Sequence, residues 1–237
     1  MTRQRRRSSI MTLSSIVTQV REENEMNNND NNQDLQRYSA NERSNHWAVA
    51  LLFIMAGLSG LALFHPALFW LSNLFGGGPW TRILHPFIGV AMFILFALMA
   101  LRFAGRNRFK AHDRLWLSQW RKVITNNEEG VPAVGKYNAG QKVLFWVLVV
   151  SMAALLLSGI AMWGAYFGGL FPIGIVRFAS LLHAFSAFVL ISSIIVHIYA
   201  AIWVKGSVGA MTSGKVSRGW ARKHHSLWYD EMRNKER

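Results

Sequence analysis

The chain has 237 residues, no cysteine and a formal net charge of +14. The lack of cysteine excludes disulfides, thiolate-held iron–sulfur clusters and covalently attached c-type haem, so any metal must be held by histidine, methionine or carboxylate. About half of the residues are apolar, and the basic residues flank apolar runs. This pattern is typical of a polytopic membrane protein and argues against nucleic-acid binding.

The first 43 residues are polar and irregular. They open with RQRRRSS and include the low-complexity run NNNDNNQD at 27–34, which predicts a disordered extension over 1–43. Paired arginines near the start are typical of an export signal, but the stretch that follows is weakly apolar and soon charged. We therefore expect no cleavable signal, and Met11 and Met26 are candidates for alternative translation starts.

Four apolar runs follow, each about long enough to cross a bilayer core of roughly 30 Å as a helix. They predict transmembrane helices over about 46–64, 85–103, 143–163 and 175–204. Together they form an expected membrane domain over 44–205, followed by a basic segment over 206–237. In the connection between the second and third runs, residues 115–124 have apolar side chains at helical spacing, which fits an interfacial helix or a plain surface helix.

Lysine and arginine counts predict the orientation. The N-terminal segment has seven, the 102–142 connection nine and the chain from Lys205 onward eight, whereas the two remaining connections contain only Arg82 and Arg177. By the positive-inside rule both termini and the 102–142 connection are cytoplasmic, and the two short connections face outward. The predicted fold class is an all-α membrane protein with a four-helix bundle.

Four histidines lie in the apolar runs, and each is followed four residues later by a very small residue. The histidines are His46, His85, His183 and His197, and the small residues are Ala50, Gly89, Ala187 and Ala201. Four residues are about one helical turn, so each imidazole stands beside a flat gap on its own helix face. A haem needs a nitrogen ligand and room for its ring. The other histidines have Phe, Trp or Tyr at that offset.

The predicted orientation assigns each histidine a depth. His85 and His183 fall near the outer face, and His46 and His197 fall nearer the cytoplasm. Since two ligands of one iron share a depth, we expect an outer haem b between His85 and His183 and an inner haem b between His46 and His197. His183 and His197 are 14 residues apart, which is about four turns and roughly 21 Å on nearly one face.

Iron with two histidine ligands has no open coordination position, which indicates electron transfer rather than catalysis at the haem. The donor and the acceptor must then lie outside the chain, and in a bilayer a quinone is the natural small partner. Arg82 and Arg177 are candidates for pairing with haem propionates, or are membrane-interface anchors. A histidine in an apolar helix can also belong to a proton relay, so a haem-free transporter or anchor is an alternative.

Five segments resemble the cytochrome b (gamma) subunit of respiratory, membrane-bound formate dehydrogenase. These are RILHPFIG (82–89), VGKYNAGQK (134–142), LLHAFSAF (181–188), HIYAAIWVKGS (197–207) and GKVSRGWARKHHSLWY (214–229). The resemblance covers about 43–229. It implies four transmembrane helices in the bacterial inner membrane and two b haems with ligands at the four histidines named above.

The resemblance also implies partners and a direction of electron flow. Electrons would come from a molybdenum- or tungsten-pterin alpha subunit, where formate is oxidised, through an iron–sulfur beta subunit to a quinone (menaquinone or ubiquinone). The quinone site would lie near the cytoplasmic haem around Asn138, with Gly140 and Gln141 as further candidates. Such a subunit transfers electrons, does not itself oxidise formate, and contributes to proton-motive force in anaerobic respiration. The cytochrome b subunit of another quinone-linked dehydrogenase, such as a membrane hydrogenase, is the closest alternative.

Overall fold

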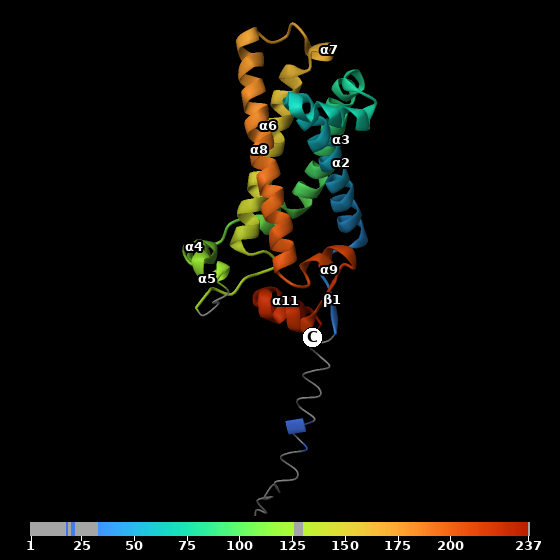
Figure 1. The fold of residues 1–237 in the computed structure, drawn as a ribbon. Helices are drawn as coiled ribbons and strands as arrows, with labels where there is room; N and C mark the ends of the chain where they lie inside the picture. The colour runs from blue at the N-terminus through green and yellow to red at the C-terminus, as the bar shows by residue number, and fades with distance from the viewer. Residues whose placement is uncertain (1–17, 19, 22–32, 126–129, 237) are drawn as a thin grey trace, which may run out of the picture.

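The computed structural model describes residues 18, 20–21, 33–125 and 130–236. Its main feature is a bundle of four long helices (Figure 1): α2 (Ala40–Phe64), α3 (Gly78–Ala104), α6 (Ala139–Met162) and α8 (Ile173–Trp203). All four are long and apolar enough to cross a membrane. The all-α membrane fold expected from the sequence is confirmed.

Each of the four helices begins two to seven residues before the apolar run that predicted it. Polar capping explains two of these early starts. Ser39 accepts a hydrogen bond from the Glu42 backbone while Glu42 reaches back to the Ser39 backbone, and Asn138 and Gln141 make the same capping box at the start of α6. Capping satisfies the first free N–H groups of a helix, so the helix extends beyond its apolar part.

The bundle is built from two helical hairpins, α2 with α3 and α6 with α8, which meet chiefly between α3 and α6. Their common core contains Ala56, Met92, Phe96, Met152 and Leu190. Much of the outer surface is apolar and exposed. Leu101 and Leu181, for example, expose 77% and 73% of their surface. Such a surface is stable in lipid, where the helices satisfy their own backbone hydrogen bonds.

One end of the bundle carries short connections. The helix η1 (Pro66–Phe75) joins α2 to α3, and α7 (Gly164–Phe167) lies between α6 and α8. Gly76 and Gly77 have φ angles of 85° and 94°, so the chain turns into α3 through two positions that favour glycine. Figure 1 shows α7 at the end opposite the C-terminus.

The other end carries a small domain that we call the terminal cap. Its strands β1 (Asp34–Gln36) and β2 (Lys215–Ser217) pair antiparallel, with Leu35 opposite Val216. Its helices are α9 (Ser207–Thr212), α10 (Arg218–His224) and α11 (Ser226–Lys235). Leu35 and Val216 pack with Trp228 and Tyr229 in a separate core. The described N-terminal and C-terminal segments therefore meet at one end of the bundle.

The connection from α3 to α6 lies at this end as well (Figure 1). It contains η2 (Gly105–Asn107), α4 (Ala111–Ser118) and α5 (Trp120–Ile124). The helix expected over 115–124 is thus two short helices that meet at Gln119. Of the expected N-terminal extension, residues 34–36 form β1 and residues 40–43 begin α2, while residues 1–17, 19 and 22–32 lie outside the described chain.

Candidate functional site

The four histidines of the apolar runs form two close pairs. The ring centroids of His46 on α2 and His197 on α8 are 6.2 Å apart, and those of His85 on α3 and His183 on α8 are also 6.2 Å apart. These are the pairs grouped by the depth argument. Their role as iron ligands is still a prediction.

This spacing fits one iron between each pair of imidazoles. A bond from a histidine nitrogen to a metal is about 2 Å long, and the ring centroid lies about 1 Å behind that nitrogen. Two axial imidazoles on one iron therefore have centroids about 6 Å apart. Face-to-face stacked rings would be closer, but the two pairs are tilted at 52° and 72°, and rings in edge-to-face contact also have centroids about 4.5–7 Å apart. The spacing is therefore compatible with an iron between the rings and does not by itself require one.

Two serines orient His85 and His183, the pair that the charge pattern of the sequence assigns to the outer face. Ser59 Oγ lies 2.9 Å from His85 Nδ1, and Ser158 Oγ lies 3.0 Å from His183 Nδ1. Each hydroxyl also lies within 2.8 Å of the backbone carbonyl one turn earlier, to which it donates its single proton. Each serine oxygen therefore accepts a hydrogen bond from the imidazole Nδ1–H. This fixes the tautomer that leaves Nε2 unprotonated and able to bind a metal.

A glycine follows each serine and lets the imidazole approach the neighbouring helix. A Cβ added at Gly60 would lie 3.1 Å from His85 Cε1, and one added at Gly159 would lie 3.5 Å from His183 Cε1. At Gly89, one turn after His85, an added Cβ would meet no atom within 4 Å. The face of α3 beside His85 therefore leaves room for a flat ring.

The inner pair lacks this serine arrangement. His46 Nδ1 is buried, and the described chain offers it no hydrogen-bond partner. Since a buried ring nitrogen without a partner costs free energy, some other group is expected to complete this site. The two pairs thus differ in the support behind the imidazole, which would give two irons different properties.

The two arginines considered for the outer pair are both exposed. Arg82 lies on α3 one turn before His85, and Arg177 lies near the start of α8. The structure records no hydrogen bond or ion pair for either within the described residues. Their positions fit propionate partners and interface anchors equally well.

The three residues considered for the quinone lie at the start of α6, at the end of the bundle that carries the terminal cap. Asn138 Oδ1 accepts from the Gln141 backbone at 2.9 Å, and Gln141 Oε1 accepts from the Asn138 backbone at 3.0 Å. The capping box therefore uses both amide oxygens and leaves both NH₂ groups to donate elsewhere. Trp116 of α4 lies against Gly140, where an added Cβ would be 3.2 Å from the indole ring.

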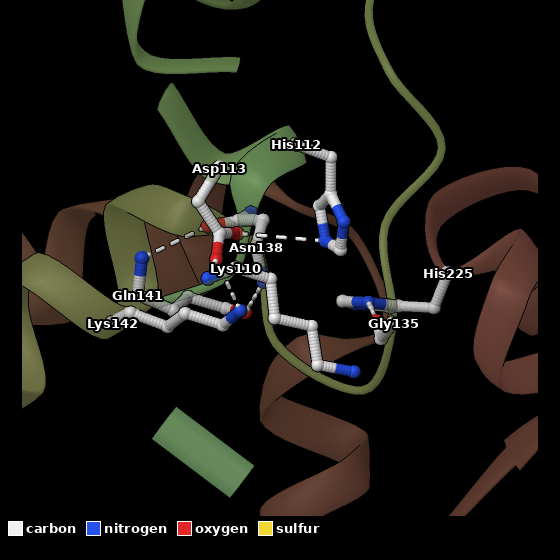
Figure 2. Close-up of polar contacts among 8 residues, drawn as sticks. All are labelled: Lys110, His112, Asp113, Gly135, Asn138, Gln141, Lys142 and His225. Atoms are coloured by element: carbon white, nitrogen blue, oxygen red, sulfur yellow. Dashed lines mark hydrogen bonds and ion pairs between the residues drawn. The ribbon is translucent and has the colours of Figure 1, made fainter. Parts of the chain in front are cut away.

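An ion pair joins α4 to α6 at the same place (Figure 2). Lys142 Nζ lies 2.7 Å from Asp113 Oδ2, and the same oxygen accepts from the Lys110 backbone N–H at 2.6 Å. Burial raises the pKa of Asp113, but the hydrogen bonds and the Lys142 charge outweigh it and lower the pKa below its ordinary value. The carboxylate is therefore ionised at neutral pH.

The terminal cap holds the other side of this loop. His225 Nδ1–H donates to the Gly135 carbonyl at 2.7 Å, and its Nε2 accepts from Arg37, which also donates to the Lys136 carbonyl at 2.8 Å. Burial and then the Arg37 charge lower the pKa of His225 to about 3, so the ring is neutral. The loop before Asn138 is thus fixed from two directions.

Sequence reasoning did not single out Ser59, Ser158, Asp113 or Lys142. The serines carried a readable signal, because Leu-Ser-Gly occurs at 58–60 and again at 157–159, once in the first helix of each hairpin. The repeat places a serine and a glycine opposite an outer histidine in both hairpins. The Asp113–Lys142 pair had no comparable signal.

Comparison with known proteins decides the family. Residues 37–214 match the family model described as prokaryotic cytochrome b561. The chain belongs to that family. Membership implies b-type haem, in agreement with the spacing of the histidine pairs.

Individual relatives within the cytochrome b561 family are more specific. The chain is 46% identical over 197 residues to the formate dehydrogenase cytochrome b556(fdo) subunit of Escherichia coli K12, covering 83% of this chain and 92% of the relative. It is 44% identical over 195 residues to the nitrate-inducible cytochrome b556(Fdn) subunit of that strain, covering 82% and 90%. The formate dehydrogenase cytochrome b556 subunit of Haemophilus influenzae is 42% identical over 195 residues, with 82% of each chain covered. The resemblance seen in the sequence motifs is confirmed.

Proposed function

We propose that this protein is the dihaem cytochrome b subunit of a formate dehydrogenase complex and that it carries electrons across the bacterial inner membrane to a quinone. The main observation behind this proposal is that four histidines form two pairs, each with ring centroids 6.2 Å apart. One histidine of each pair lies on α8, at a different position along the helix. Formate is proposed as the electron donor because the relatives are named as formate dehydrogenase subunits.

In this proposal His85 and His183 hold the outer haem, and His46 and His197 hold the inner one. When bound, the two haems supply one-electron oxidation and reduction between the two faces of the membrane. Two histidines on each iron would leave no coordination position for another ligand, so the haems would transfer electrons and would not bind substrate. Ser59 and Ser158 keep the outer imidazoles in the metal-binding tautomer.

The direction of transfer follows from the orientation. Positive charge is concentrated in the terminal cap and in the connection from α3 to α6, so that end is assigned to the cytoplasm together with both termini. The opposite end has little charge and would dock an iron–sulfur subunit that receives electrons from a molybdenum- or tungsten-pterin subunit. Formate oxidised outside and quinone reduced with cytoplasmic protons would then add to the proton-motive force in anaerobic respiration.

The quinone site is assigned to the start of α6. Asn138 and Gln141 have amide NH₂ groups that can donate to a quinone carbonyl, because the capping box occupies only their oxygens. Gly140 lets the indole of Trp116 pack against the start of α6, so Trp116 forms one side of the proposed site. Whether menaquinone or ubiquinone is used depends on the host membrane.

The test is an assay of the purified complex. With formate as donor, the complex should reduce a quinone analogue while its b-type absorbance cycles, and hydrogen should give no activity. Activity with hydrogen instead of formate would assign the chain to a membrane hydrogenase. A complex with no b-type haem would leave only a haem-free transporter or anchor.

A further inference from the structure

A buried ion pair lies about one helical turn from Asn138, the main candidate for binding the quinone. The side chains of Lys142 and Asp113 are 4% and 1% exposed, and their charged atoms are 2.7 Å apart. Taking two charges out of water costs about as much as their attraction returns, so an apolar pair would stabilise the α4–α6 contact at least as well. Stability alone therefore does not explain these two residues.

The pair is close to the quinone-site candidates along α6. Lys142 lies four residues after Asn138, which is about one helical turn, so the two residues share a face at the start of the helix. Trp116 lies one turn after Asp113 on α4 and rests against Gly140. Figure 2 shows Lys142 and Asp113 beside the capping box of Asn138 and Gln141.

The second oxygen of the Asp113 carboxylate faces a partly exposed side chain. Asp113 Oδ1 is buried, and no hydrogen-bond partner for it is recorded in the described chain. The nearest titratable group on that side is His112, whose Nε2 is 3.7 Å away and whose side chain is 33% exposed. A buried acceptor oxygen without a partner, next to a partly exposed imidazole, is arranged to receive a proton from outside.

We propose that His112, Asp113 and Lys142 form the proton entry of the quinone site, with Lys142 as the group that protonates the bound quinone. This inference rests on the proposed quinone reduction. The groups on the described chain that face Asp113 are Lys142 from α6 and His112 from α4, together with the Lys110 backbone N–H.

Reduction of the bound quinone needs both electrons and protons. The quinone takes up two electrons, which the proposed activity supplies, and two protons to give the quinol. For each proton, an N–H bond of the Lys142 ammonium breaks as the quinone O–H bond forms. A proton from cytoplasmic water then crosses His112 to Asp113 Oδ1, and rotation of the carboxyl group delivers it to Lys142 Nζ, which regains its charge. The carboxylate is ionised again once it has given this proton to Lys142, and the restored Lys142 charge then lowers the pKa of Asp113.

The test uses membranes that contain the intact complex. The haems are reduced chemically, mixed with a quinone analogue, and followed by b-type absorbance as they are reoxidised. Asp113→Asn keeps the size of the side chain and an acceptor for Lys142 but carries no proton. We expect it to slow reoxidation by about 100-fold, the low end of what a positioned proton donor contributes. The half-saturating quinone concentration should change by less than about twofold, because the binding residues are intact.

Two further variants keep the test decisive if Asp113→Asn fails to assemble. His112→Gln changes a partly exposed side chain and should slow reoxidation by about tenfold, with a larger solvent deuterium isotope effect than the wild type. Asp34→Asn is the matched control, because it removes the same charge from the exposed pair with Lys215 in the terminal cap. Its rate should equal that of the wild type.

The outcomes separate the two proposals. Reoxidation at the wild-type rate in both Asp113→Asn and His112→Gln would overturn the proton entry while leaving the quinone site standing. A higher half-saturating concentration with an unchanged maximal rate would also overturn it, because it would give the pair a structural role. Wild-type haems that quinone does not reoxidise would overturn the quinone site and the proton entry together.

Discussion

Replacing Ser59 with alanine should raise the midpoint potential of the outer haem. Ser59 is fully buried, and its Oγ accepts a hydrogen bond from His85 Nδ1–H at 2.9 Å. If His85 binds the haem iron as proposed, this hydrogen bond would make the imidazole a stronger electron donor and would stabilise the ferric state more than the ferrous state. Without the acceptor the ferric state loses this support, so reduction becomes easier.

The size of the shift follows from the hydrogen bond. A buried neutral hydrogen bond contributes about 1 kcal/mol. Since a tenfold change in a one-electron equilibrium is about 1.4 kcal/mol or about 59 mV, the outer haem should shift upward by at most about 40 mV, the value reached if the hydrogen bond stabilises only the ferric state. Ser158→Ala acts on the other proposed ligand of the same iron and should give a shift of similar size, and the double variant should give at most about 80 mV if the two add.

A potentiometric titration of membranes, followed by b-type absorbance, measures this shift. The control is Ser151→Ala, which alters a buried serine on α6 that makes no recorded hydrogen bond to any of the four histidines in the described chain. It should leave both midpoints unchanged, and Ser59→Ala should leave the inner midpoint unchanged. No shift, a downward shift, or a shift of the inner haem would refute the tautomer assignment.

Three more predictions follow from the pairing, the capping box and the terminal cap. His85→Ala should remove only the outer haem and His46→Ala only the inner one, as seen in redox titrations; loss of the same haem from both would overturn the pairing. Asn138→Ser keeps a helix-capping oxygen but removes the amide donor, so the quinone KM should rise about tenfold with haem content unchanged, and an unchanged KM would exclude Asn138 from the site. His225 has its pKa lowered to about 3, so its neutral form stabilises the cap above about pH 6.5, and this stability is lost as the pH falls below that value. Between pH 7 and pH 5 the free energy of unfolding of the cap should fall by about 2 kcal/mol. An Ala221→Cys variant measures this loss: its rate of thiol labelling, divided by the rate for the unfolded chain at the same pH, should rise about 30-fold. A ratio that does not change with pH would contradict the buried neutral ring.

The spans and the grouping of the histidines were accessible from the sequence because both depend on one-dimensional signals. Hydropathy defines a span from consecutive residues, and lysine and arginine counts orient the spans. His85 and His183 are almost 100 residues apart, yet depth alone placed them at one level. The early starts of α2 and α6 were missed because polar caps such as Ser39 lie outside the apolar run.

Contacts between distant polar residues could not be predicted in this way. Asp113 and Lys142 are separated by 29 residues, and an aspartate next to a histidine in a basic connection has no signature of burial. The strands of the terminal cap have three residues each and lie about 180 residues apart, so neither shows the alternation by which a strand is recognised. Arg37 and His225 meet only because these strands pair.

The proposed function requires two b-type haems in this chain. The most direct measurement is the haem content of the purified complex, combined with a redox titration of its b-type absorbance. We expect two haems for each copy of this chain and two one-electron steps, both reducible by formate. One haem, or none, would contradict the assignment of His46, His85, His183 and His197 as two pairs of iron ligands.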